Sequence, residues 1–562
     1  MANEKGRCIF WPAAGFAVAL FVVLLVTYLL TLSRRNSPDG MSFALLTTRS
    51  DASNPLFFQA EHLLYPAWGW AWYRLWQGFG YGDGALRPMQ VLSAIAGASG
   101  VASFYIGLYW VLGATMIYPQ LNHLPKGVRT LPSLGEGGGI HGVVPLSLCG
   151  ALLLGVSYGY WFHSTESEDQ IIANALLAGA FAILAVIMTR TEPRGHSMSL
   201  ELTLGGLSSL AILSHATAVL FLPALVVGLL LARVPRRSWI AIAVTIGGIV
   251  SVSYAFVGLV VHGFRSPEDF EQWLSSAPRL GVWGQGGLRS LLQASETLAG
   301  SVVYSGSGPD FKRLLSGSLE TQNVLAATAF FVTLLAVGGS VVYVLVRWRR
   351  LPSRRFVAVG LVWTALYAVF GTYWAPEDLQ FWIGLWPALI LLISLALANG
   401  IMHRPRVRHF AGGFLFATVA AIALYNLGTA IVPRSDLAHN DDYAKAICLK
   451  DHTFANDLVI SPGWDWTSTY VPYFAHREVL SIVDDYLLAA GKDAGRLKQD
   501  LAGQIAKTRA SGGRVFVVRL YDLDENDRAW LARTTGLQPE DFPYPRNEAW
   551  RCAGETVWEI RP

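Results

Sequence analysis

Long apolar runs alternate with short polar stretches over the first three quarters of the chain. A helix needs about 20 apolar residues to cross a hydrocarbon core of about 30 Å, and eleven segments of this sequence meet or approach that length. The pattern therefore predicts a polytopic α-helical membrane protein with about 11 transmembrane helices. The predicted spans are residues 12–33, 88–117, 143–162, 169–189, 198–214, 216–232, 239–262, 324–346, 356–372, 381–399 and 410–432.

Two long polar segments, residues 34–87 and 263–323, interrupt the spans. Loops of this length usually carry function or helices of their own. The first is dense in Trp and Tyr from His62 to Trp76, a composition suited to a helix in the membrane interface. The same aromatic residues would also fit a belt that only anchors the protein.

The pattern becomes that of a soluble protein near residue 433. Short apolar runs alternate there with helical sequence, which predicts a small α/β domain over residues 433–562, after a transmembrane domain over residues 1–432. It contains no glycine-rich phosphate loop, which argues against nucleotide hydrolysis. Strands are expected at 457–463, 513–518 and 556–560, and a helix at 525–535.

Composition supports the membrane assignment. The 562 residues are 53% hydrophobic and 15% charged, with a mean hydropathy of +0.39, which is too apolar for a soluble chain of this size. The net charge is +4, but the basic residues flank hydrophobic runs and do not form one face. We therefore expect no nucleic-acid partner.

Arginine-rich loops predict the orientation of the spans. The loops at 233–237, 347–355 and 404–408 fall on one side, and cytoplasmic loops retain such residues. With a cytoplasmic N-terminus and an odd number of spans, the C-terminal domain would be extracytoplasmic. We expect a multi-pass protein of a bacterial inner membrane.

The four cysteines lack the spacing of a structural zinc site. Cys448 and Cys552 both fall in the predicted extracytoplasmic domain. An oxidising compartment would allow a disulfide between them, and the alternative is two buried thiols.

Asp39 is the first candidate for chemistry. It follows the first span in Pro38-Asp39-Gly40, at the predicted outer surface. A carboxylate there can act as a general base toward a hydroxyl if its surroundings raise its pKa toward the working pH. Pro-Asp-Gly is also an ordinary turn sequence.

Further polar groups fall on the same predicted face. Capping or dipole effects would explain one acid at a helix start, and a single edge histidine is often structural. Ionisable groups near hydrocarbon are costly and tend to mark function, so we expect several of them to meet around one cavity. These groups are Glu61, His62, His163, Glu166, Glu168, Asp169, His215, Glu377 and Asp378.

Three short patches resemble the GT-C superfamily of membrane glycosyltransferases, which use polyprenyl-phosphate-linked sugars. The patches lie at 38–40 with 62–66, at 161–168 and at 213–223. The first is similar to the protein O-mannosyltransferase-like and dolichyl-phosphate-mannose-type branches, and in the family the acid matching Asp39 is the base. Family members often pair two acids in this loop, whereas Gly40 follows here, so Glu166 or Glu168 would supply the second carboxylate.

The resemblance implies an inverting transfer of a hexosyl or pentosyl group from a polyprenyl-phosphate-linked donor to a lipid, glycan or protein hydroxyl. Asp39 would be catalytic, and a divalent cation, Mg²⁺ or Mn²⁺, could assist. Candidates for the departing phosphate are Arg74, Arg87, His215 and Arg265. Expected substrate-binding residues are Glu61, His62, Tyr65, Arg74, Glu166, Glu168, His215, Arg265, Glu377 and Asp378.

Two other functions fit a polytopic chain. One is a transporter or flippase for a lipid-linked or polar substrate, and the other is a non-catalytic scaffold subunit. Transporters usually show charged or broken spans near the midplane and internal repeats. Here the polar groups gather at the outer edges of the spans, which favours the enzyme.

Overall fold

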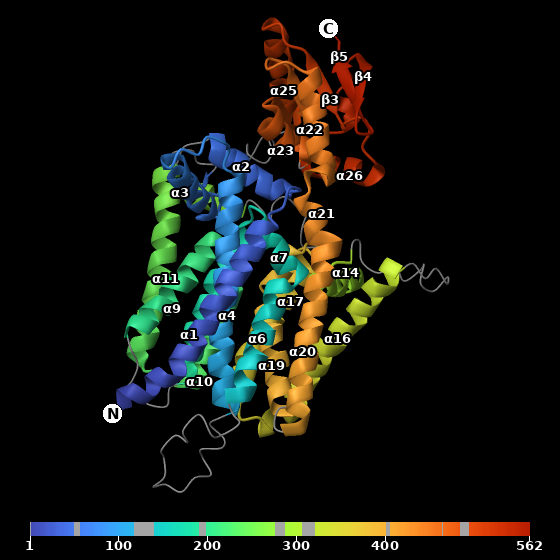
Figure 1. Ribbon diagram of the computed structural model, residues 1–562. Helices are drawn as coiled ribbons and strands as arrows, with labels where there is room; N and C mark the ends of the chain where they lie inside the picture. Colours follow the sequence, from blue (N-terminus) through green and yellow to red (C-terminus); the bar gives the residue numbers. More distant parts are fainter. Residues whose placement is uncertain are drawn as a thin grey trace, which may run out of the picture.

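A computed structural model describes residues 2–49, 57–116, 140–189, 198–275, 287–305, 321–400, 405–463, 465–483 and 494–561. The chain forms a bundle of long helices with a small mixed sheet domain at one end (Figure 1). The N-terminus lies at the opposite end of the bundle. We call the end that carries the C-terminal domain the domain end.

Helices occupy all eleven predicted spans. Within the described residues, eight helices are long and apolar enough to cross a membrane. A ninth span is a helix pair bent by 59° between Gly142–Val156 and Tyr158–Thr165, and Met198–Ser214 and Ala216–Ala232 are shorter apolar helices. The fold is therefore that of a polytopic helical membrane protein.

Apart from the long segments at 34–87 and 263–323, most connections between consecutive bundle helices are short. The bundle helices are α1 (Ala2–Leu30), α4 (Leu86–Met116), α6 (Ile140–Val156), α7 (Tyr158–Thr165), α8 (Asp169–Thr189), α9 (Met198–Ser214), α10 (Leu222–Ala232), α11 (Arg236–Phe256), α16 (Thr321–Arg347), α17 (Arg354–Trp374), α18 (Gln380–Ile383), α19 (Trp386–Gly400) and α20 (Pro405–Asn426).

Burial separates central from peripheral helices. The apolar window of Asp169–Thr189 is 72% buried and that of Gln380–Gly400 is 83% buried. The windows of Arg236–Val261 and Asn323–Arg350 are only 11% and 17% buried. The central helices therefore pack on protein, whereas the peripheral ones present apolar side chains outward, as lipid contact requires.

Short helices cover the domain end. α2 (Pro38–Arg49) and α3 (Tyr65–Gly78) form within the first long segment, and α12 (Pro267–Leu274) and α14 (Leu288–Gly300) within the second. α3 is the aromatic helix expected from the sequence. Parts of the second segment, at 276–286 and 306–320, lie outside the described residues.

The C-terminal domain follows α21 (Val432–Ser435) and contains one five-stranded sheet in the order β2-β1-β3-β5-β4. β1 pairs in parallel with β2 and β3, and β5 pairs antiparallel with β3 and β4. The strands are β1 (Leu458–Ser461), β2 (Glu478–Ser481), β3 (Val515–Val518), β4 (Arg546–Cys552) and β5 (Glu555–Ile560). The helices are α22 (Asp441–His452), α23 (Trp466–Tyr470), α25 (Ala494–Ala510) and α26 (Glu525–Thr535).

β1, β3 and β5 lie where the sequence predicts strands, and α26 where it predicts a helix. The hydrophobic pattern does not predict β2 or β4. β4 is an edge strand in which five of the seven residues, including Arg546 and Glu548, are exposed, so it lacks the alternation of a half-buried strand.

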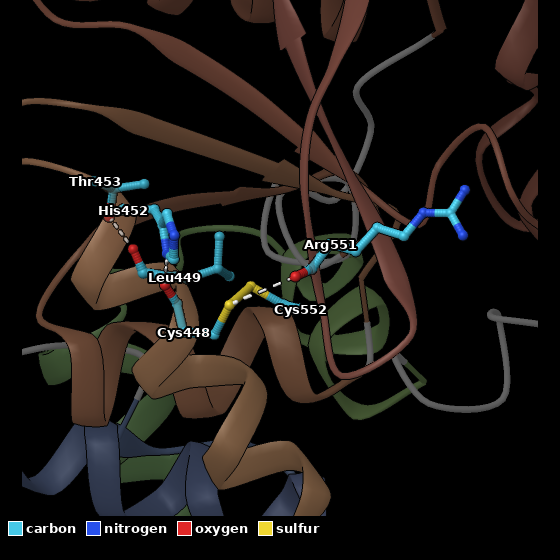
Figure 2. The surroundings of a disulfide bond; sticks show 6 residues. All are labelled: Cys448, Leu449, His452, Thr453, Arg551 and Cys552. Carbon is cyan, nitrogen blue, oxygen red and sulfur yellow. Dashed lines mark hydrogen bonds between the residues drawn. A yellow bond between two sulfur atoms is a disulfide. The ribbon is translucent and has the colours of Figure 1, made fainter.

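The two faces of the sheet bury different residues. Leu458 and Ile460 pack toward α25, whereas the intervening Val459 packs with residues of α22 and α23. This alternation is the period of two that a pleated strand imposes. On the second face a disulfide joins Cys448 of α22 to Cys552 of β4, as Figure 2 shows. Of the two alternatives for these cysteines, the structure has the bridge.

Candidate active site

Three acids within four residues lie buried at the domain end, where the chain passes from α7 to α8. The exposed fractions are 0% for Glu166 and 2% each for Glu168 and Asp169. Ser157 interrupts the preceding span, and the 59° bend there turns α7 across the bundle. Burying carboxylates costs several kcal/mol each unless other groups compensate, so their partners reveal how the site is built.

Glu166 has a complete set of partners. Arg434 of α21 pairs with its carboxylate at 2.9 Å, Ser33 donates from its hydroxyl at 3.1 Å, and Ser37 donates from its main-chain nitrogen at 2.9 Å. Arg434 also lies 4.2 Å from the centroid of the Phe162 ring. Burial raises the pKa of Glu166, and Arg434 opposes that rise. The role of Glu166 in this structure is to hold other segments together.

Asp39 lies in the first turn of α2, directly beside this acidic run. Ser37 bonds to Glu168 through its hydroxyl, and Ser167 donates to the Gly40 carbonyl at 2.6 Å. A Cβ at position 40 would lie 2.9 Å from the main-chain oxygen of Ser167, so only glycine allows this approach. Gly40 is therefore needed for the packing of α2 against Ser167.

Asp39 itself is exposed, in contrast to the acids behind it. It nevertheless acts electrostatically on Glu168, His62 and Asp378, which places it among the candidate residues. Burial, with added repulsion from Asp39, raises the pKa of Glu168 well above its usual value. Burial and the bond to Ser37 keep Glu168 away from solvent, which leaves Asp39 as the accessible carboxylate.

The pKa of Asp378 is raised by burial and by the neighbouring acids, as that of Glu168 is. Asp378 lies between α17 and α18, and burial raises its pKa to about 7, with Asp39 and Glu377 adding to the rise. Its side chain accepts hydrogen bonds from the main chain and the amide of Gln380. Glu377 is exposed.

Main-chain pairing brings two histidines together. The Leu64 nitrogen donates to the Leu213 oxygen at 2.8 Å, and the Ala216 nitrogen donates to the Glu61 oxygen at 2.9 Å. These bonds place the rings of His62 and His215 with their centroids 4.9 Å apart. Two segments more than 140 residues apart in the sequence thus form one wall of the site.

Both imidazoles meet Asp169. His62 contacts its carboxylate through Nδ1, and Nε2 of His215 lies 3.8 Å from the same oxygen. Burial lowers the pKa of His62, but Asp169, Glu61 and Asp39 raise it by more, so the net shift is upward. Burial lowers the pKa of His215 to about 4, so this imidazole is neutral at pH 7.

His62, Asp169 and His215 also have the composition of a metal site. One ligand atom from each lies within 4.8 Å of the others. Two imidazoles and a carboxylate are the donor set of catalytic zinc, whereas Mg²⁺ prefers oxygen ligands alone. The residues fit a zinc-type cation better than the Mg²⁺ or Mn²⁺ expected from the acids.

The remaining predicted residues have different surroundings. Tyr65 packs edge-on against Phe43, with ring centroids 4.8 Å apart, close to Glu168 and Asp169. Arg74 lies on α3, bonded to Gln77 and over the Trp70 ring. Arg265 lines an apolar surface groove of about 660 Å³ beside α12.

Asp169 is among the ionisable groups expected on this face but not among the expected substrate-binding residues, and Arg434 is in neither set. Asp169 begins α8, where an acid is also expected as a helix cap, and Arg434 follows the last span as an ordinary basic residue. The sequence could have indicated Arg434 only through its position, because it is a cation on the predicted face where the acids lie. Its pairing with a carboxylate 268 residues earlier could not be read from the sequence.

Comparisons with known proteins give a likeness of fold. No family model matches the sequence, and no curated protein matches it either. ArnT from Cupriavidus metallidurans bound to undecaprenyl phosphate matches at a TM-score of 0.55 and 12% identity, over 97% of this chain and 98% of that one.

Two further solved structures resemble the chain. The apo state of the same ArnT matches at a TM-score of 0.52 and 13% identity, over 98% of each chain. The apo Archaeoglobus fulgidus oligosaccharyltransferase matches at a TM-score of 0.49 and 13% identity, over 99% of this chain and 74% of that one. The likeness to ArnT shows that this chain shares the fold of that protein over 97% of its length, here a polytopic membrane bundle followed by a small sheet domain.

Proposed function

We propose that the protein transfers a sugar from a polyprenyl-phosphate-linked donor to an acceptor hydroxyl, with inversion, and that Asp39 is the general base. The observation that carries the proposal is the exposed carboxylate of Asp39, whose neighbours Ser37 and Gly40 are bonded to Glu168 and Ser167 in the buried acidic run. The shared fold with an ArnT that binds undecaprenyl phosphate supports a polyprenyl-phosphate donor. The patch at 38–40 favours a mannosyltransferase-like enzyme.

In the proposed step the acceptor oxygen bonds to the anomeric carbon as its proton passes to the Asp39 carboxylate. The bond between that carbon and the phosphate oxygen breaks, and its electron pair stays on the phosphate. A base must lie within hydrogen-bond reach of the proton it removes. Asp39 meets the requirement of access, since the neighbouring Glu166 and Glu168 are buried and bonded to protein.

The departing phosphate needs cationic neighbours. Arg87 is half-buried at the start of α4, and Arg34 lies near enough to act on it electrostatically. Within the described part of the chain neither guanidinium forms an ion pair. Arg74 is bonded to Gln77 and lies over the Trp70 ring, and Arg265 lines the groove beside α12. We therefore assign the phosphate to Arg87 and Arg34 in preference to these two.

We further propose a zinc-type cation on His62, Asp169 and His215. Such an ion supplies Lewis-acid stabilisation of phosphate oxygens when bound. Purified protein should then contain about one zinc per chain by elemental analysis, and His215→Ala should remove it. The control is His439→Ala, which removes an exposed histidine that follows the last span and should leave the zinc content unchanged. Equal zinc in both variants would contradict the assignment.

The arginine-rich loops support an extracytoplasmic site. We further propose that the membrane is a bacterial inner membrane. The runner-up function is a transporter or flippase, favoured by the span broken at Ser157.

One assay separates enzyme from transporter. Asp39→Asn, reconstituted in membranes with a polyprenyl-phosphate sugar, should lose about 10²- to 10⁴-fold in transfer rate because the base is gone. Glu268→Gln is the control, since it removes an exposed acid of α12 at the same end of the bundle. Unchanged transfer in Asp39→Asn would reject the base, and movement of intact donor across the membrane without transfer would favour the runner-up.

A further inference from the structure

The segment that leads into α2 is bonded throughout to the C-terminal part of the chain. We call residues 34–36 the approach segment, because they end three residues before Asp39. Its six main-chain polar groups all bond to residues 434, 440 or 470. Connecting segments usually run over the surface, where water can bond their main chain, so complete pairing with protein is unusual for a loop.

Arg434 and Asn440 hold the first two residues. The nitrogens of Arg34 and Arg35 both donate to the Arg434 oxygen, at 2.7 and 3.2 Å. The Arg434 side chain donates to the Arg35 oxygen at 2.9 Å, and Asn440 donates from its amide to the Arg34 oxygen at 2.5 Å. Both residues lie where the last span gives way to the C-terminal domain.

Tyr470 holds the main chain of the third residue, Asn36, whose side chain also accepts a hydrogen bond from the Gln90 amide at 2.9 Å. The Asn36 nitrogen donates to the Tyr470 hydroxyl at 2.8 Å, and the hydroxyl donates to the Asn36 oxygen at 2.9 Å. Tyr470 ends α23 and is 1% exposed, with Met41 of α2 in the same apolar cluster. A phenolic hydroxyl can donate and accept at once, whereas phenylalanine would keep the packing and lose both bonds.

We propose that Tyr470 is a positioning residue of the transferase: through the Asn36 main chain it fixes the approach segment and hence the place of Asp39. The C-terminal domain is then part of the catalytic unit, in addition to any role in covering the site or recognising the acceptor. This inference rests on the proposed function. A misplacement of about 1 Å of a reacting group can cost about 10²-fold in rate, so the bonds are sufficient to affect turnover.

Other bonds between the domain and the bundle provide a comparison. Arg49 donates to the Pro472 oxygen at 2.6 Å, and the Leu86 nitrogen donates to the Tyr473 hydroxyl at 3.1 Å. These contacts dock the domain on the far end of α2 and on α4, and leave the approach segment untouched. Removing the Tyr473 hydroxyl therefore tests docking, whereas removing the Tyr470 hydroxyl tests positioning.

The experiment compares three variants of the full chain in lipid nanodiscs, Tyr470→Phe, Tyr473→Phe and Tyr443→Phe. Tyr443 packs on Phe474 in the same domain, with ring centroids 5.0 Å apart, and serves as the control for a lost hydroxyl. Tyr470→Phe should lower kcat by about 10- to 100-fold with KM for the donor unchanged. Hydrogen exchange of residues 34–40 should accelerate in this variant alone, while the spans keep their protection.

Several results would overturn the proposal. Unchanged exchange at residues 34–40 in Tyr470→Phe would rule out the hold on the approach segment, and an equal loss of kcat in Tyr473→Phe would show general docking in its place. A rise in KM at constant kcat would assign Tyr470 to donor binding. If the unaltered protein transfers no sugar, the proposed function fails, and the exchange measurement still decides whether Tyr470 holds this segment.

Discussion

The domain end of the bundle and the C-terminal domain adjoin each other but are stabilised in different ways. The domain end buries charged and polar groups, such as Glu166, Asp169 and His215, whose partners come from distant segments. The C-terminal domain buries mainly apolar residues of its own strands, pairs its buried Asp457 and Asp465 with arginines of the same domain, and is closed by a disulfide.

The two kinds of burial differ in how much substitution they tolerate. Apolar burial is non-directional and tolerates small changes. Buried charges depend on every partner being present, because a charge left unpaired keeps its full desolvation cost. A change of one polar group at the domain end should therefore do more harm than a comparable change in the sheet domain.

The largest effect on stability is expected from Glu166→Gln. The substitution keeps the shape but leaves Arg434, whose side chain is 22% exposed, without its carboxylate. Breaking a buried pair in this way costs about 3–5 kcal/mol of unfolding free energy. Denaturation of the detergent-solubilised chain would measure it, with the exposed Glu377→Gln as the control. Equal stability of the two variants would mean that the buried pair is not stabilising.

Removing the disulfide should lower the stability of the C-terminal domain. Replacing Cys448 and Cys552 together by Ser frees a loop of 104 residues and should cost about 2–4 kcal/mol of domain stability. Limited proteolysis would report unfolding of the sheet domain while the bundle helices stay protected. Cys149→Ala alters a buried thiol of α6 and should leave the domain unchanged. In the unaltered protein, peptide mapping without reductant should recover the two cysteines as one cross-linked species, and two alkylatable thiols would contradict the bridge.

A smaller change is expected at the contact of α2 with the acidic run. Gly40→Ala adds a Cβ that would lie 2.9 Å from both the main-chain and the hydroxyl oxygen of Ser167, so the first turn of α2 must shift. We expect about 1–2 kcal/mol of destabilisation and a lower transfer rate, since Asp39 is adjacent. Gly78→Ala at the end of α3 meets open space and is the matched control. If both variants transfer sugar equally well, the close approach at Gly40 has no bearing on Asp39.

Much of the architecture follows from local patterns. The eleven apolar segments become helices at the predicted places because length and hydropathy alone decide whether a segment can cross a membrane. Three of the five strands follow from short buried runs, and the polar edge strand β4 does not. The sequence also indicates which acids and histidines deserve attention, because ionisable groups beside apolar spans are few.

The partners of those groups are decided by the tertiary structure. Nothing near His62 in the chain indicates that it meets Asp169 and His215, and nothing near Glu166 indicates Arg434. The sequence by itself determined the spans, most of the C-terminal domain and a set of candidate residues, because these depend on short-range composition and period. Only packing decided which of them are buried, paired or open to solvent, since those properties depend on contacts between segments hundreds of residues apart.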